Sequence, residues 1–171
     1  AVVNTTPDSF YSGSRVPEFE TALARGLEAF DLGADVVDVG GESTRPGADV
    51  VSETEELSRV IPVVEALAHH GPVSVDTQKE SVARAAVAAG ATIINDVSAT
   101  LAHVAAELGV GYVAMHRQGT SATMQNDPHY DDVVAEVHGF LSDSSAPWFT
   151  AGISPLWLDP GIGFGKTVAH N

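Results

Sequence analysis

Cysteine is absent from the 171-residue chain, and basic residues are scarce. The lack of thiols excludes disulfides, zinc–thiolate centres and cysteine nucleophiles, and it favours a reducing, cytoplasmic location. The chain has 8 Lys and Arg against 23 Asp and Glu, a formal net charge of −15. Because nucleic-acid binding requires basic groups that neutralise phosphates, this balance argues against a nucleic-acid partner. An anionic substrate would depend on a few placed cations or on a metal ion.

Long hydrophobic runs are also missing. No apolar stretch reaches the ~20 residues that a membrane span needs, and no signal-peptide pattern is present. We therefore expect no membrane partner. Hydrophobic residues make up 44% of the sequence, which is enough for one soluble, packed domain over residues 1–171.

Short apolar, β-branched runs alternate with segments of helical periodicity. Strands are expected at residues 1–4, 34–39, 73–76, 92–95, 112–116 and 156–159. Strands that alternate with helices predict a parallel sheet with right-handed crossovers, and either a doubly wound sheet or a barrel satisfies this order.

Two features favour the barrel. The first turn lacks the G-x-G-x-x-G fingerprint of a doubly wound sheet. In addition, polar residues end the strands in series, as functional side chains do in TIM barrels: Asn4, Asp38, Asp76, Asn95, His116 and Asp159. We therefore predict an α/β fold of the (β/α)8 barrel type. About six strand–helix units are present, so the domain is expected to be truncated at the C-terminus, and at the N-terminus because it starts within a strand pattern.

Local signals predict details of several helices. Ser52 with Glu55, and Thr77 with Glu80, match the capping-box pattern at a helix start. The polar run at 143–147, which ends in Pro147, is expected to interrupt a helix and leave 148–155 as a helix remnant or an irregular connector.

The strand-end residues also suggest a ligand. Asp38, Asn95 and Asp159 offer two carboxylates and an amide, which suit the paired N–H donors of a flat amino-heterocycle. Magnesium is the rival ligand, because three oxygen ligands suit it equally. Asp76 is expected either to orient Asn95 or to cap the helix near Thr77. Each of these residues, taken alone, is as well explained as a helix cap.

Other catalytic patterns fail. A phosphate loop ending at Lys166 would need glycine at position 160, which is Pro160. Neither H-E-x-x-H nor G-x-S-x-G occurs, so a histidine zinc site and serine hydrolysis have little support. Arg45 is equally consistent with a solvated charge and with an anion-binding or lid role.

Six motifs in order resemble the dihydropteroate synthases of folate biosynthesis. They are NTTPDSF (4–10), DVGGESTRPG (38–47), VSVDT (73–77), INDVS (94–98), MHRQGT (115–120) and DPGIGFGK (159–166). The resemblance covers almost the whole chain. It implies a (β/α)8 barrel transferase, the target of sulfonamides, that joins 6-hydroxymethyl-7,8-dihydropterin pyrophosphate to p-aminobenzoate and releases pyrophosphate.

The resemblance also implies roles for individual residues. The pterin ring would be held by Asp76, Asn95 and Asp159, with Met115 and Phe164 as apolar walls. Asp38 would lie near the reacting methylene, and Asn4 would bind the Mg²⁺ that accompanies pyrophosphate. The loops over p-aminobenzoate would include Phe10, Thr44, Arg45 and Pro46.

The resemblance implies a homodimer for the full-length protein. In the family, a lysine and a Ser-Arg pair after the seventh strand and an Arg and a His near the eighth complete the site, so the 171-residue chain alone is expected to have little or no synthase activity. Two alternatives remain: a pterin-binding domain of a methyltetrahydrofolate methyltransferase, and a non-catalytic paralogue.

Overall fold

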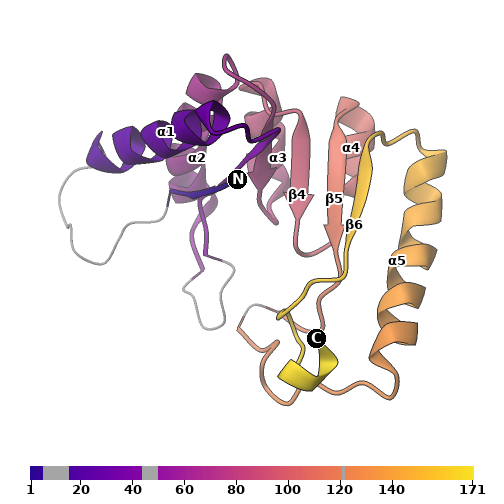
Figure 1. Cartoon of the computed structure of the whole chain (residues 1–171). Coiled ribbons are helices and arrows are strands. Elements are labelled where there is room, and N and C mark those ends of the chain that lie inside the picture. Colours follow the sequence, from indigo (N-terminus) through magenta and orange to yellow (C-terminus); the bar gives the residue numbers. More distant parts are fainter. Residues whose placement is uncertain (6–15, 44–49, 121) are drawn as a thin grey trace.

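The computed structural model describes residues 1–5, 16–43, 50–120 and 122–171. Within these residues strands and helices alternate along the chain (Figure 1). The elements are β1 (Val2–Asn4), α1 (Val16–Asp31), β2 (Val37–Gly40), α2 (Glu53–Leu67), β3 (Val73–Asp76), α3 (Glu80–Ala88), β4 (Ile93–Asp96), α4 (Ala102–Leu108), β5 (Gly111–Met115), α5 (Val133–Thr150), β6 (Leu156–Asp159) and the 3-10 helix η1 (Val168–His170).

The strands form one parallel sheet in the order β1-β2-β3-β4-β5-β6. Each strand pairs with its neighbour in sequence, so the order never reverses as it does in a doubly wound sheet. Asp76 pairs in register with Gly40 and Asn95, and Met115 pairs with Asp159. The predicted barrel-type α/β fold is confirmed, and the carboxyl ends of the strands meet along one edge of the sheet.

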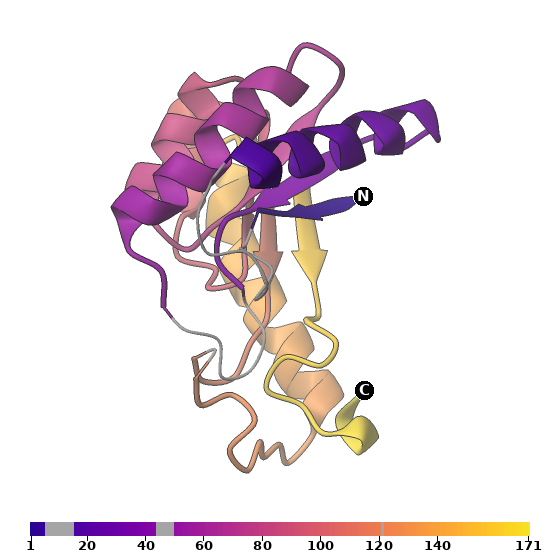
Figure 2. The same ribbon diagram turned by 90° about the vertical axis from the view of Figure 1, so that its left-hand side faces the viewer.

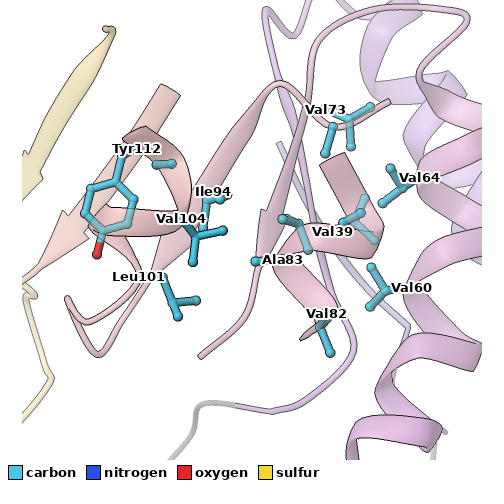
Figure 3. Packing of buried hydrophobic residues seen from close by; sticks show 14 of the residues in the cluster. Val39, Val60, Val64, Val73, Val82, Ala83, Ile94, Leu101, Val104 and Tyr112 are labelled. Atoms are coloured by element: carbon cyan, nitrogen blue, oxygen red, sulfur yellow. The ribbon is translucent and has the colours of Figure 1, made fainter. Parts of the chain in front are cut away.

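The hydrophobic core lies between the sheet and its helices. Figure 1 shows α3 and α4 behind β4 and β5, and α5 beside β6. Figure 3 shows side chains of the sheet, such as Val39 and Ile94, packed beside helical residues such as Val60, Val64 and Val104. These five are fully buried. Because each fully buried Val or Ile contributes about 1.5–3 kcal/mol, this layer holds the sheet in place.

Helix termini follow the local sequence signals in part. Ser52 caps α2 and accepts a hydrogen bond from Glu55 N at 3.2 Å, as predicted. The second predicted capping box is wrong, because α3 starts after Lys79, which makes no side-chain cap. Thr77 Oγ1 instead donates to Glu56, a residue of α2 that the local pattern does not include.

The predicted interruption at residues 143–147 is also wrong. Helix α5 continues to Thr150 with Pro147 inside it. Pro147 lies in the last turn, where its missing N–H removes one hydrogen bond, and its carbonyl still accepts from Ala151 N at 2.9 Å. In the part of the chain that the structure describes, no helix is long and apolar enough to cross a membrane.

Candidate functional site

Alternate residues of the strands face away from the helices, on the inner side of the sheet. Val37 and Val39 are buried against the core, whereas Asp38 between them is turned to the opposite face. Asp38, Asn95 and Asp159 line one cavity of about 540 Å³ together with other inner-face residues, among them Ser74, Val113 and Trp157. The structure therefore brings the three predicted polar residues together around a common hollow.

Asp38 and Asn95 are joined across the sheet. The Asn95 amide Nδ2 donates to Asp38 Oδ2 at 3.0 Å, so Asp38 and not Asp76 orients this amide. Burial raises the pKa of the Asp38 carboxyl, and the nearby Ser74 hydroxyl and the Asn95 amide oppose that rise. Asp38 Oδ1 and Ser74 Oγ are buried and have no partner of hydrogen-bonding geometry among the described residues. Such orphan oxygens are costly, and a ligand with donors would satisfy them.

Asp76 is the second unsatisfied carboxylate. Its Oδ1 is buried and has no hydrogen-bond partner in the described part of the chain, although the residue as a whole keeps some exposed surface. Burial and the negative charges of Asp38, Glu56, Asp96 and Glu42 raise the pKa of Asp76 to about 8. The sequence offered Asp76 as a possible cap of the next helix, but α3 has no side-chain cap.

The side chains of Asn4 and Asp76 both lie close to Gly40. A methyl group at Gly40 would lie 3.5 Å from Asp76 Oδ2 and 3.7 Å from Asn4 Oδ1. Two oxygen donors therefore lie at this end of the sheet, and Mg²⁺ is bound in many sites by one or two protein oxygens with the remaining ligands from phosphate or water. No group of three His, Asp or Glu side chains within the described ranges is placed to hold a metal ion.

A buried charge network lies under β3. Glu56 of α2 is 0% exposed and accepts hydrogen bonds from Thr77 Oγ1 at 2.6 Å and from Lys79 Nζ at 2.5 Å. Lys79 also contacts Glu42. A buried carboxylate is tolerated when it is paired and hydrogen-bonded in this way. The network fixes the loops after β2 and β3 on either side of Asp76, and it adds to the negative potential there.

Asp96 follows Asn95 and points to the other side of the sheet. It is fully buried and accepts hydrogen bonds from Ser98 N and Oγ, Thr100 N, Leu101 N and the Tyr112 hydroxyl, at 2.5–2.8 Å. Burial and the Asp96 charge raise the pKa of Tyr112. The carboxylate of Asp96 thus organises the loop that leads into α4, and it is not directed to the cavity.

The loops after β5 and β6 lie side by side at one end of the sheet (Figure 2). Asp159 Oδ1 accepts from Gly161 N at 2.7 Å, which closes the turn after β6. Met115 is buried and Phe164 is half-buried. His116, placed by the sequence among the inward strand ends, faces away from the cavity: its ring packs edge-on against Phe140 of α5.

Four of the predicted site residues lie outside the described part of the structure. They are Phe10, Thr44, Arg45 and Pro46, which were expected in the loops over p-aminobenzoate.

Sequence reasoning missed five residues that shape this region. Ser74 and Trp157 line the cavity, and Asp96, Glu56 and Lys166 are buried in the loops and helices at the ends of the strands. Alternation along the strands could have found Ser74 and Trp157, which are two residues before Asp76 and Asp159. Glu56 and Lys166 gave no such signal, because their partners are distant in sequence.

Comparison with known proteins identifies the family. The model of the pterin binding enzyme family matches residues 1–171. The chain belongs to this family. The dihydropteroate synthase of Escherichia coli K12 is 47% identical over 99% of this chain. The dihydropteroate synthase structure from Yersinia pestis, solved with a sulfonamide drug, has a TM-score of 0.89 at 43% identity and covers 99% of this chain and 65% of its own.

A second pterin binding enzyme of known structure has been solved with small molecules. The Xanthomonas albilineans dihydropteroate synthase with 4-aminobenzoic acid has a TM-score of 0.87 at 50% identity, and covers 99% of this chain and 63% of its own. The same protein in complex with 7,8-dihydropteroate has a TM-score of 0.82 at 46% identity, with 99% and 62% covered. The present chain spans about 63% of the length of the E. coli relative.

Proposed function

We propose that the protein is a dihydropteroate synthase, which condenses 6-hydroxymethyl-7,8-dihydropterin pyrophosphate with p-aminobenzoate to 7,8-dihydropteroate and pyrophosphate. The observation that carries this proposal is the cavity lined by Asp38, Asn95 and Asp159 together, in a chain of the pterin binding enzyme family. The complexes of its relatives with 4-aminobenzoic acid and with dihydropteroate support the choice of substrates.

Pterin recognition would rest on Asp76, Asn95 and Asp159. A pterin presents amino and ring N–H donors along one edge, and carboxylates pair well with planar, parallel donors of this kind. The Asp76 Oδ1 atom, which has no partner among the described residues, would gain one from the pterin. Met115 at the end of β5 and Phe164 in the loop after β6 would form the apolar walls against the ring faces.

The chemical step would use electrostatics and no covalent intermediate. The bond between the pterin methylene carbon and the pyrophosphate oxygen breaks, and the p-aminobenzoate nitrogen forms the new bond to that carbon and loses a proton. Positive charge develops on the pterin methylene as pyrophosphate leaves. Asp38, oriented by Asn95, would stabilise that charge from a largely buried position, where electrostatic effects are stronger than in water.

Asn4 would contribute to the magnesium site. Its amide oxygen and the Asp76 carboxylate both lie near Gly40, which suits a cation that receives its remaining ligands from pyrophosphate. Magnesium, when bound there, supplies positive charge that stabilises the departing pyrophosphate. In a protein with a formal net charge of −15, few protein groups can supply that charge.

Several parts of this proposal rest on the family resemblance. Phe10, Thr44, Arg45 and Pro46 would belong to loops that close over p-aminobenzoate and exclude water from the reactive methylene. A homodimer, a cytoplasmic location and sulfonamide inhibition are also part of the proposal, together with the absence of a nucleic-acid partner.

Ordered ligand binding tests the function. In calorimetric titration of the natural protein that contains these residues, pterin pyrophosphate should bind with Mg²⁺, and p-aminobenzoate should bind only afterwards. Asn95→Ala should weaken pterin binding at least ~10-fold, because it removes a ring contact and leaves Asp38 unpaired. Asn126→Ala, in an exposed loop, is the matched control. If the wild-type protein binds no pterin, or forms no dihydropteroate with both substrates present, the proposal is wrong.

A further inference from the structure

Lys166, in the glycine-rich loop after β6, has a buried ammonium group without a carboxylate partner among the described residues. The side chain belongs to a residue that is 5% exposed. Nζ lies 3.1 Å from His116 Nδ1, 3.0 Å from Gly161 O, 3.1 Å from Phe164 O and 3.4 Å from His116 O. Burial lowers the pKa of this ammonium group, and the Asp159 charge opposes the shift. A buried charge is tolerated here because its three N–H donors all have acceptors.

The acceptors of Lys166 belong to two different loops. His116 directly follows Met115 at the end of β5, whereas Gly161 and Phe164 lie in the turn after β6. Gly161 N in turn donates to Asp159 Oδ1 at 2.7 Å. One ammonium group therefore connects the backbone beside three proposed pterin contacts: Met115, Asp159 and Phe164.

The two loops are packed without spare room. A Cβ at Gly161 would lie 2.0 Å from His116 O and 3.0 Å from Met115 Cγ, and one at Gly165 would lie 2.6 Å from Gln118 O. Both glycines also have positive φ values, 67° and 62°, which side chains disfavour. The loops can approach this closely because these positions lack side chains, and Lys166 bridges them from the inside.

His116 is held in the orientation that Lys166 needs. Its ring packs edge-on against Phe140, with ring centres 5.1 Å apart, and lies 6.1 Å from the Tyr130 ring. The Tyr130 hydroxyl donates to Gly165 O at 2.8 Å, which ties the same loop a second time. Because the ammonium group donates to Nδ1, the imidazole accepts there and carries its proton on Nε2.

We propose that Lys166 is a positioning residue, which ties the end of β5 to the loop after β6 and so sets the distance between the pterin-binding side chains on these two elements. The inference rests on the proposed function. Lys166 does not itself present a cation to the substrate, because its donors are occupied by His116 and by backbone carbonyls. Its effect on the reaction passes through Met115, Asp159 and Phe164.

The first test compares two substitutions in the natural protein that contains these residues. Lys166→Met keeps the aliphatic stem and removes the donors. We expect the KM for pterin pyrophosphate to rise about 10-fold or more, with the KM for p-aminobenzoate changed less than about twofold and kcat less than about threefold. Arg84→Met, which removes a surface cation paired with Glu80 and Glu107, should change none of these values.

The second test replaces the acceptor of the same hydrogen bond. His116→Asn places an amide oxygen near the position of Nδ1, whereas His116→Leu offers no acceptor. The asparagine variant should keep pterin affinity close to that of the wild type, and the leucine variant should match Lys166→Met. Quenching of Trp157 fluorescence by pterin pyrophosphate gives the affinity directly, because this indole lines the cavity.

The outcomes separate the two proposals. If the wild-type protein binds no pterin pyrophosphate, the proposed function is wrong. If the wild type binds it and Lys166→Met binds equally well, or loses kcat without a change in the pterin KM, the positioning role alone is wrong. If Lys166→Met fails to fold by circular dichroism, the His116 pair decides: equal pterin affinity in the asparagine and leucine variants overturns the proposal.

Discussion

Asp76 and Asp96 are aspartates at the ends of neighbouring strands, and the hydrogen bonding of their carboxylates differs. Asp96 faces the helices and accepts five hydrogen bonds from described residues. Asp76 faces the inner side, and its buried Oδ1 has no partner among those residues. Within the described part of the chain, the hydrogen bonding of the Asp96 carboxylate is complete and that of the Asp76 carboxylate is incomplete. The first therefore serves the fold, whereas the second is suited to a ligand.

The largest effect is expected at Asp96. Asp96→Ala leaves the buried Tyr112 hydroxyl and three backbone N–H groups without their acceptor, and we expect it to lower the free energy of unfolding by about 3–5 kcal/mol. Urea denaturation followed by circular dichroism measures this. Asp143→Ala, on an exposed position of α5, is the control and should change little. A loss below about 1 kcal/mol at Asp96 would remove the distinction drawn between the two aspartates.

A smaller effect of opposite sign is expected at Asp76. Its pKa of about 8 in the folded protein lies above the ordinary aspartate value of 3.8, so the folded state binds more protons between these pH values and loses stability as pH rises through them. Asp76→Asn removes the ionisable group and therefore removes this loss of stability at high pH. At pH 8 the variant should be more stable than the wild type by about 1–2 kcal/mol, and near pH 4 the difference should largely vanish.

The same substitution should reduce function. Pterin donors require the ionised carboxylate, so we expect Asp76→Asn to weaken pterin binding at least about 10-fold, and wild-type affinity to rise with pH towards 8. Thermal unfolding at pH 4 and pH 8, with titrations of pterin over the same range, checks both parts. A variant that is less stable than the wild type at pH 8 would contradict the expectation that the ionised Asp76 carboxylate lowers the stability of the folded protein.

The smallest effect is expected at Ser74. Its hydroxyl is buried beside Asp38 without a partner of hydrogen-bonding geometry in the described chain, so Ser74→Ala removes no formed bond. We expect a stability change within about 1 kcal/mol, measured by denaturation. The pKa of Asp38 should rise further, because the Ser74 hydroxyl opposes its upward shift. A larger loss of stability would mean that Ser74 belongs with Asp96 as a structural group.

Much of the architecture follows from the sequence because its signals are local. Alternation along each strand predicts that Asp38 and Asn95 face away from buried Val39 and Ile94, and the parallel order brings their ends to one edge. The same alternation explains the error at His116. Met115 occupies the inward position in β5, so the next residue is turned towards α5.

At two other positions, Thr77 and Lys166, the side chains have partners that are distant in sequence. Thr77 has the local pattern of a helix cap, but its hydroxyl donates to Glu56, 21 residues earlier. In the sequence, Lys166 ends a glycine-rich loop that does not match the phosphate-loop pattern. In the structure its ammonium group donates to His116, 50 residues earlier. Such contacts exist only after the sheet has formed, so no local pattern contains them.

The strict sequential order of the sheet has a consequence for biosynthesis. Each strand from β2 to β6 pairs with the strand made just before it, so none of these five strands has to wait for a later segment in order to dock. The sheet can grow in the direction in which the ribosome releases the chain, one strand and its helix at a time.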